Sequence, residues 1–286
     1  ADSSLSSGII INKDTTIDGA SHIISGSNSK DVRLFAVNKG TLTLKNIIIT
    51  DLNYNADDKG IIYQNGGNLV LDNVTFQNSG YKSLIWADGG SLTVTNSYFV
   101  NNSGRWGGAL SVMGGESSSA TNFIDIDGTK FVNNSALYGG AMFVWGSNYS
   151  ISNSVFDNNS AFGKGNMTPN NNNGGALVVT QGNIPISGTI INSNFTNNKA
   201  QYGGAAWINE GTIDISNSNF INNTATVEAG AIGFEPAYTK ITATVYATNF
   251  INNTAGVDGG AIYSNGDLRI SDSDFDNNKA QKADII

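Results

Sequence analysis

The residues that could catalyse a reaction are few, and the strongest candidates are Asp125 and Asp127. Two positions apart on a strand, their carboxylates would project from one face and lie side by side. Cleavage of a polysaccharide needs two or three such groups, often with an Arg or His close by. Equivalent positions in the neighbouring repeats hold only Thr and Ser, with no Arg or His alongside. We therefore expect a solvated polar face here, and we predict that the protein is not an enzyme and has no catalytic residues.

Metal and cofactor chemistry has even less support. His22 is the sole histidine and there is no cysteine, so neither a catalytic triad nor a zinc site can be assembled. Asp272, Asp274 and Asp276 imitate the start of a calcium-binding loop, but the glycine and the closing glutamate of that loop are missing. No glycine-rich phosphate-binding motif leads from a strand into a helix. The sequence thus predicts no metal and no cofactor.

Binding is the function that the aromatic residues indicate. Six of them fall where a strand side chain should point away from the core, and these are Tyr63, Trp86, Phe143, Trp145, Trp207 and Tyr263. Exposed aromatic rings in a row are unusual on a soluble surface and often mark a binding site. Two structural interpretations remain as alternatives to a binding site. The rings could form a stacking ladder on the outside of the coil, or they could lie on a strand face that inserted loops cover.

These candidates are positioned by a sequence repeat. The motif Phe-x-Asn-Asn recurs, with one degenerate first copy, at Phe76, Phe99, Phe131, Phe156, Phe195, Phe220, Phe250 and Phe275. Successive spacings run from 23 residues (Phe76 to Phe99) to 39 residues (Phe156 to Phe195), and the longer ones contain insertions, most plainly from Gly163 to Asn173. Gly-Gly-Ala follows most copies, beginning at Gly107, Gly139, Gly174, Gly203 and Gly259, and Ala229 replaces the first glycine once.

Between these landmarks the sequence alternates with a period of two, which indicates strands. Aliphatic residues occupy the seventh and fifth positions before each Phe, as at Leu92 and Val94, and Asn usually occupies the third, as at Asn96. One repeat cannot bury its own apolar side, so the repeats must stack and place like residues over like. We expect continuous ladders of Phe and of Asn, with the third-position Asn pointing inward.

The predicted fold is all-β: a right-handed single-stranded parallel β-helix of about ten coils. It forms one domain over residues 1–286, with an atypical N-terminal coil over 1–40 and repeats over 41–286. Ala283 to Ile286 fall where the next Gly-Gly-Ala-Ile would begin, so we expect the solenoid to continue in a longer protein.

Composition restricts the partners. A net charge of −8 argues against nucleic acid, whose phosphates require a basic face. No apolar run approaches the roughly 20 residues of a membrane span, so we expect no membrane insertion within this segment. We also expect a monomer located outside the cell, at the cell surface. Of nine Asn-x-Ser/Thr sequons, those at Asn148 and Asn166 lie outside the Asn-Asn turn and are the candidates for glycosylation.

The paired motifs resemble known repeat families. Gly-Gly-Ala-aliphatic together with Phe-x-x-Asn resembles the passenger repeats of the chlamydial polymorphic membrane proteins. The Asn-rich form Phe-x-Asn-Asn-[Ser/Thr/Lys]-Ala, with the opening Ile17-Asp18-Gly19, is similar to the large adhesin-like surface proteins of methanogenic archaea. The resemblance covers residues 9–286 and departs from the pattern at Ser79 and Ala229. It implies a parallel β-helix displayed outside the cell and used for adhesion.

The sequence therefore predicts a cell-surface adhesin module that binds a glycan or a protein on another cell. A polysaccharide-degrading β-helix enzyme, whether lyase or glycoside hydrolase, is one alternative. A passive structural spacer is the other.

Overall fold

Short parallel strands make up the regular structure of the protein. The computed structural model describes residues 8–26, 31–54, 57, 59–114, 123–162, 172–180, 186–237 and 240–282. Within these ranges there is no α-helix, and hence no helix long and apolar enough to cross a membrane. Most of the insertion predicted from Gly163 to Asn173, the sequon at Asn166 and the segment from Ala283 to Ile286 lie outside the described residues.

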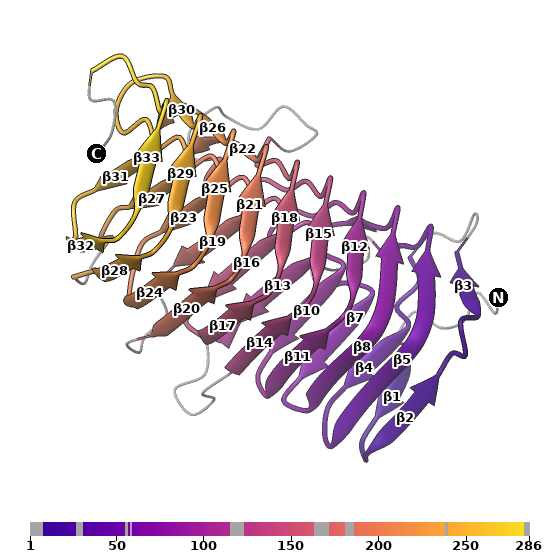
Figure 1. Cartoon of the computed structure of the whole chain (residues 1–286). Coiled ribbons are helices and arrows are strands. Elements are labelled where there is room, and N and C mark those ends of the chain that lie inside the picture. Colours follow the sequence, from indigo (N-terminus) through magenta and orange to yellow (C-terminus); the bar gives the residue numbers. More distant parts are fainter. Residues whose placement is uncertain are drawn as a thin grey trace.

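Three long ladders of parallel strands form the sides of each coil (Figure 1). Sheet A contains β1 (Ile9–Ile11), β4 (Phe35–Val37), β7 (Ile62–Asn65), β10 (Ile85–Asp88), β13 (Leu110–Met113), β16 (Met142–Trp145), β19 (Leu177–Thr180), β23 (Ala206–Ile208), β27 (Ile232–Phe234) and β31 (Ile262–Ser264). Sheet B contains β2 (Thr15–Asp18), β5 (Thr41–Thr50), β8 (Asn68–Gln77), β11 (Ser91–Thr95), β14 (Phe123–Asp127), β17 (Asn148–Ser152), β20 (Ser187–Ile191), β24 (Thr212–Ser216), β28 (Thr242–Tyr246) and β32 (Asp267–Ser271).

Sheet C continues each coil after a corner, and the long strands β5 and β8 run through both sheet B and sheet C. Its remaining members are β3 (Ile23–Ser25), β12 (Tyr98–Val100), β15 (Lys130–Val132), β18 (Val155–Asp157), β21 (Asn194–Thr196), β25 (Asn219–Ile221), β29 (Asn249–Ile251) and β33 (Asp274–Asp276). Two short parallel sheets lie between sheet C and sheet A: β22 (Lys199–Tyr202), β26 (Thr224–Glu228) and β30 (Thr254–Ala255), and β6 (Asn53–Tyr54) with β9 (Gly80–Tyr81).

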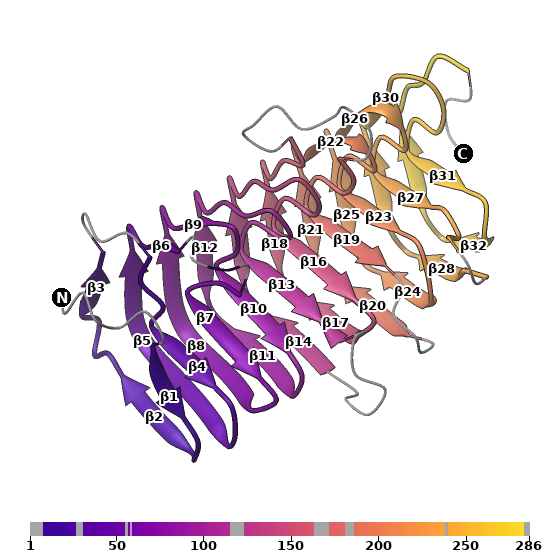
Figure 2. The same ribbon diagram turned by 180° about the vertical axis from the view of Figure 1, so that it is seen from behind.

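The stacked coils form a parallel β-helix of about nine turns, which confirms the predicted fold class. In Figure 1 the strands of sheet C rise on the near side while the coils advance from right to left. Figure 2 shows the strands of sheet A descending on the opposite side. A chain that rises in front and descends behind while it advances in this direction is a right-handed coil.

The core lies inside the coil and is built from the alternate residues that the period-two pattern marked, such as Leu92 and Val94 on β11. The repeated Phe side chains form the predicted ladder. From Phe76 to Phe250 they are completely buried. Successive rings lie 4.5 to 5.4 Å apart between centroids, with planes 3 to 9° from parallel. This regular stack runs through the coils from β8 to β33, and Ile49 of β5 takes the same position one coil earlier.

The Asn ladder is present, but the expectation that the third Asn before each Phe points inward was wrong. Asn96 is exposed and has a φ of 49°, and its equivalents share this conformation. Each forms the corner between sheet B and sheet C, where the chain needs left-handed geometry that Asn tolerates. The corner inserts a residue into the alternation, so the next residue, Ser97, becomes the buried one.

The buried ladder is instead formed by the second residue of each Asn-Asn pair. Asn159 is fully buried, and its Nδ2 donates to Asn198 Oδ1 in the next coil at 3.1 Å and to the Phe131 carbonyl at 2.9 Å. The same pattern recurs in Asn134, Asn198, Asn223 and Asn253. Asn159 Oδ1 in turn accepts from the Asn134 amide at the turn of the preceding coil, so each side chain ties the turns of neighbouring coils together, which explains why Asn recurs there.

Candidate functional site

A second apolar cluster lies on the outer side of sheet A, separate from the core. Its buried members are Met113, Phe143, Val178, Trp207 and Ala229, and its partly buried members are Trp86, Trp106, Tyr138, Trp145, Tyr202 and Tyr263. We call these residues the outer aromatic cluster. It contains five of the six aromatic residues that the sequence singled out, and Tyr63 is the sixth.

Strand register places the predicted residues in one outward row, except Trp145, which lies two positions further along β16 beside Met113 and Thr180. Trp86 pairs with Ser111, and the row continues through Phe143, Val178, Trp207 and Gly233 to Tyr263. Their neighbours on either side, such as Ile85 and Ala87 around Trp86, belong to the core. Alternation along each strand therefore sends the row to the outside, as the sequence indicated.

The rings of this row are much less exposed than expected. Tyr63, Phe143 and Trp207 retain only 8%, 6% and 5% exposure. Around the last two stand residues that sequence reasoning missed, the aromatic residues directly before the Gly-Gly pairs: Trp106, Tyr138 and Tyr202. The available signal was the aromatic-Gly-Gly sequence at each of these three places.

Ring contacts hold the outer aromatic cluster together. Trp106 stacks on Tyr138 with centroids 4.6 Å apart and meets Phe143 at 5.0 Å in a tilted arrangement. Trp207 lies 5.4 Å from Tyr202 and 6.4 Å from Tyr263. Gly233, in the row between Trp207 and Tyr263, leaves the necessary space, because an added Cβ would fall 2.1 Å from the Trp207 ring. The cluster is thus irregular, unlike the Phe ladder of the core.

A pocket of about 380 Å³ opens in the outer aromatic cluster near the middle of sheet A. It is lined by Trp86, Trp106, Met113, Phe143, Trp145 and Thr180. The structure therefore brings Trp86, Phe143 and Trp145 together in one cavity. Trp207 and Tyr263 lie further along the row, toward the C-terminal coils, and do not line it.

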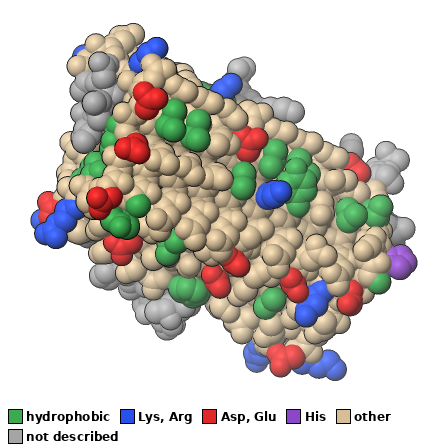
Figure 3. Space-filling view, viewed as in Figure 1, with side chains coloured by type: hydrophobic (Ala, Val, Ile, Leu, Met, Phe, Trp, Pro, Cys, Tyr) green, Lys and Arg blue, Asp and Glu red, His purple; other side chains and the backbone are tan. Residues whose placement is uncertain are grey.

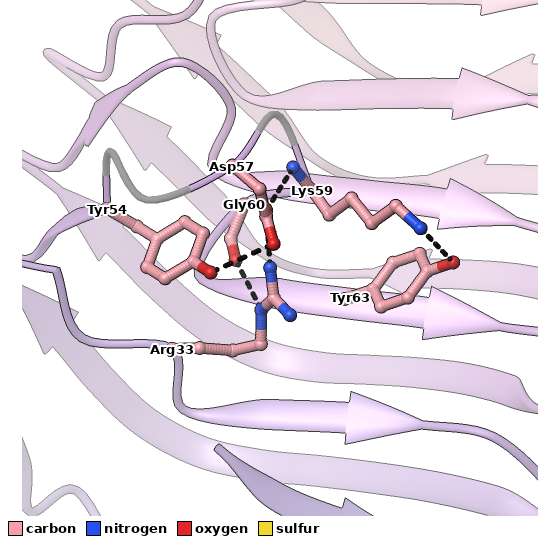
Figure 4. Close-up of polar contacts among 6 residues, drawn as sticks. All are labelled: Arg33, Tyr54, Asp57, Lys59, Gly60 and Tyr63. Atoms are coloured by element: carbon pink, nitrogen blue, oxygen red, sulfur yellow. Dashed lines mark hydrogen bonds and ion pairs between the residues drawn. The ribbon is translucent and has the colours of Figure 1, made fainter. Parts of the chain in front are cut away.

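Tyr63 belongs to a different group, built around the buried Arg33 (Figure 4). The Arg33 guanidinium lies over the Tyr54 ring at 4.6 Å, donates to the Gly60 carbonyl at 3.2 Å and pairs with Asp57 at 2.5 Å. Lys59 Nζ donates to the Tyr63 hydroxyl at 3.1 Å. These contacts join the loop after β6 to β7.

Burial and hydrogen bonding oppose each other at Asp57. Burial would raise the pKa of this carboxyl, but hydrogen bonds from the Lys59 amide and from Arg33 lower the pKa below its usual value. The Tyr63 hydroxyl, and more weakly Asp88, raise the pKa of Lys59. Both side chains are therefore charged at neutral pH and form a stable ionic group beside Tyr63.

The C-terminal part of the outer side of sheet A is acidic. Glu228 and Asp258 are paired neighbours in the row that precedes Gly-Gly, next to Tyr202. Burial, and then repulsion from Asp258 and Glu235, raise the pKa of Glu228. Asn265 Nδ2 donates to Glu235 Oε2 at 2.5 Å and to the Tyr263 hydroxyl at 3.0 Å. The outer aromatic cluster thus ends among carboxylates.

The sheet B face, where the acidic pair lies, has a different surface. Figure 3, which looks onto sheet C with sheet B below it, shows hydrophobic side chains only as small separate groups in a largely polar surface. Asp127 accepts hydrogen bonds from Ser152 Oγ at 2.6 Å and from Asn153 Nδ2 at 2.7 Å, and these lower its pKa. Asp125 pairs in register with Ser150, also on this face. The carboxylate of Asp127 is thus held as an ionised hydrogen-bond acceptor.

Metal-binding and modification candidates are placed as follows. His22 is exposed, with Nδ1 2.8 Å from the Gly19 carbonyl oxygen. Across the described residues no three His, Asp or Glu side chains gather as a metal site would require. Asn148 is half-buried at the start of β17, and its Oδ1 accepts from the Ser187 amide at 2.7 Å. Its glycosylation stays a prediction.

Comparison with known proteins adds one local match. Residues 247–265 match the Chlamydia polymorphic membrane protein repeat. They contain Phe250 with its Asn-Asn pair and the Gly-Gly-Ala that begins at Gly259, so the match supports the resemblance to the chlamydial repeat. No curated protein and no solved structure matches the chain. Fold and repeat together fit a surface adhesin-like module, whereas the resemblance to methanogen proteins stays a prediction.

Proposed function

We propose that this protein is an extracellular adhesin module that binds a protein or a glycan on another cell through the outer aromatic cluster. The observation that carries the proposal is the aromatic pocket lined by Trp86, Phe143 and Trp145. Apolar cavities with a few polar groups are the usual form of a binding site. A β-helix presents such a cavity on a rigid sheet, so little conformational entropy is lost when a ligand binds.

The repeat supports a surface location for the module. The family that matches residues 247–265 is described as a membrane protein repeat, and the same Phe-x-Asn-Asn and Gly-Gly-Ala motifs recur along the chain. Binding, rather than catalysis, is the function that the aromatic pocket supports.

An array of glycans and of purified extracellular protein domains tests the proposal. The parent protein should bind at least one class, and the double variant Trp86→Ala with Trp145→Ala should lose that binding. Tyr246→Ala is the matched control, because Tyr246 is a 48% exposed aromatic residue on sheet B, away from the pocket. Binding that survives the double variant would remove the pocket from the proposal.

The same array separates the alternatives. Release of shorter oligosaccharides from any glycan would indicate a polysaccharide-degrading enzyme. Absence of binding to every glycan and every protein would favour a passive spacer, with the outer aromatic cluster serving only to stabilise sheet A.

A further inference from the structure

The pocket of the outer aromatic cluster exists because one small residue interrupts a row of large ones. In the row that runs across sheet A, Ser111 stands between Trp86 and Phe143. The hydroxyl of Ser111 is bonded to Ser83 Oγ and to the Trp106 carbonyl, so it is already engaged within the chain. A serine here leaves open the volume that an aromatic ring would fill, and Met113 and Phe143 line the space.

Two indole rings line this space without an aromatic partner. Among the described residues, no ring stacks on Trp86 or Trp145, whereas Trp106, Tyr138 and Phe143 all contact one another. Trp86 lies on β10 and Trp145 on β16, two coils apart, which corresponds to about 10 Å along the axis. That separation leaves room for one further ring or branched aliphatic group between the two strands.

The lining of the pocket is suited to an apolar ligand with a single hydrogen-bond acceptor. Thr180 carries the only hydroxyl among the six lining side chains, and the others are Trp, Phe and Met. Trp86 Nε1 is buried and has no hydrogen-bond partner. A sugar ring would lose water from several hydroxyls without finding partners, and each unpaired group is costly. A hydrophobic side chain next to a main-chain carbonyl avoids this cost.

Charges of opposite sign flank the pocket along the axis of the coil. The exposed Arg105 lies over the ring of Trp106, which lines the pocket, at 5.5 Å. Glu228 and Asp258 stand in the same row as Trp106, four and five coils further on. At the spacing of stacked strands, Glu228 is about 19 Å from Trp106. A ligand that follows this row therefore meets a cation at one end and, at the other, two carboxylates, of which Asp258 already pairs with Lys282 at 3.9 Å.

We propose that the pocket receives one aromatic or large aliphatic side chain from an extended segment of a partner protein. A main-chain carbonyl beside that side chain accepts the hydrogen bond from Trp86 Nε1. The segment runs along sheet A, with an acidic residue near Arg105 and basic residues near Glu228 and Asp258. This inference rests on the proposed adhesin function and names its ligand as a protein rather than a glycan.

Synthetic peptides of this pattern provide the test. The first has a central Phe, an Asp two residues to one side and two Lys residues roughly five residues to the other, a length that spans the distance to Glu228. The second has Asp and Lys exchanged, and the third has Ser in place of Phe. Each peptide is also made with its sequence reversed, so that both chain directions are sampled. Titration calorimetry and tryptophan fluorescence report binding to the folded parent protein.

The first peptide, in one of its two directions, should bind about tenfold more tightly than the charge-exchanged peptide at low salt, and the Ser peptide should not bind measurably. Trp86→Phe keeps the ring and removes the indole N–H, so it should weaken binding about fivefold. The double variant Arg105→Glu with Glu228→Lys should reverse the charge preference. Tyr246→Ala should leave all affinities unchanged.

Several outcomes would overturn this inference. Equal affinity for the Phe and Ser peptides, or no binding of any peptide at millimolar concentration, would remove the apolar anchor. Binding of an oligosaccharide that depends on Trp86 and Trp145 would assign the pocket to a glycan, and the adhesin function would still stand. Dimerisation that Trp145→Ala abolishes would assign it to a second copy of this chain. If neither the array nor the peptides bind, both proposals fall together.

Discussion

The protein contains two arrays of aromatic rings, one inside the coil and one outside it, and they obey different rules. The inner array has one Phe at the same position of each coil from Phe76 onward, with rings nearly parallel and completely buried from Phe76 to Phe250. The outer array has large rings at some coils and Ser111, Val178 or Gly233 at others. Its ring pairs include tilted and edge contacts, with planes at 54 to 61°.

This difference shows how a repeat protein can separate stability from recognition. A uniform inner row gives every coil the same neighbours, which makes stacking cooperative along the solenoid. An outer row that varies from coil to coil cannot form a continuous stack, and its gaps become cavities. The pocket beside Ser111 is such a gap. A position that is repeated strictly therefore indicates packing, and a position that varies within the same row is a candidate for function.

The largest expected effect tests the inner array. Phe195→Ala removes a fully buried ring that stacks on Phe156 at 4.5 Å and on Phe220 at 4.9 Å. The loss should be about 3–5 kcal/mol of unfolding free energy, as for other buried Phe truncations. Urea denaturation followed by circular dichroism measures it. A change under about 1 kcal/mol would mean that the inner ladder is not the source of stability.

An equivalent truncation in the outer array should cost less. Trp207→Ala removes a ring that is 5% exposed and contacts Tyr202 and Tyr263. We expect about 2 kcal/mol, because the space left opens to solvent and the neighbouring rings can relax into it. The same denaturation series gives the comparison with Phe195→Ala. A larger loss at Trp207 than at Phe195 would reverse the assignment of stability to the inner array.

The pocket walls should contribute least to stability and most to binding. Trp145→Ala removes a half-buried indole with no stacked partner among the described residues, so the unfolding free energy should fall by less than about 1 kcal/mol. Binding to the ligand found on the array should nevertheless fall at least tenfold. A variant that loses more stability than Trp207→Ala would identify Trp145 as a structural residue.

Sequence periodicity was sufficient to predict the inner array and the direction of the outer one. The strict spacing of Phe195 and its equivalents identified the stacked coils, and alternation placed Phe143 outside because Met142 and Val144 point inward. Both inferences depend only on the period of a strand. They hold wherever the chain is extended and uninterrupted.

The exposure of the outer rings could not be predicted in this way. The aromatic residues near Phe143 and Trp207 lie in an isolated bridge or, for Tyr202, beyond a register shift at the end of β22, so alternation along a regular strand does not give their direction. Trp106, before its Gly-Gly pair, is one of them. The corner at Asn96 shows the same limit, because a single left-handed residue reverses the alternation and moves the buried position to Ser97. Sequence alone does not reveal that reversal.

The smallest expected effect is on thermal stability, whose pH dependence should differ between carboxyls on the two outer faces of the coil. Burial, followed by repulsion from Asp258 and Glu235, raises the pKa of Glu228 beside the outer aromatic cluster. On the sheet B face, hydrogen bonds from Ser152 and Asn153 lower the pKa of Asp127. The ionised form is thus disfavoured by folding at Glu228 and favoured by folding at Asp127.

The two carboxyls should therefore give thermal stabilities of opposite pH dependence. The folded protein holds the Glu228 proton more tightly than the unfolded chain does. Ionisation of Glu228 therefore lowers the stability of the fold: this loss is absent below the ordinary pKa of 4.5 and complete above the raised pKa of the folded state. Glu228→Gln should then raise the Tm slightly at pH 7 and leave it unchanged at pH 3.

Asp127 should behave in the opposite way. Its contribution to folding stability is complete above the ordinary pKa of 3.8 and is lost as the pH falls through the lowered pKa of the folded state. Asp127→Asn should accordingly lower the Tm at pH 7, and the difference should shrink as the solution is acidified. Calorimetric scans of both variants between pH 3 and pH 7 measure these changes, and a shift of the same sign for both at pH 7 would show that the faces do not differ in this respect.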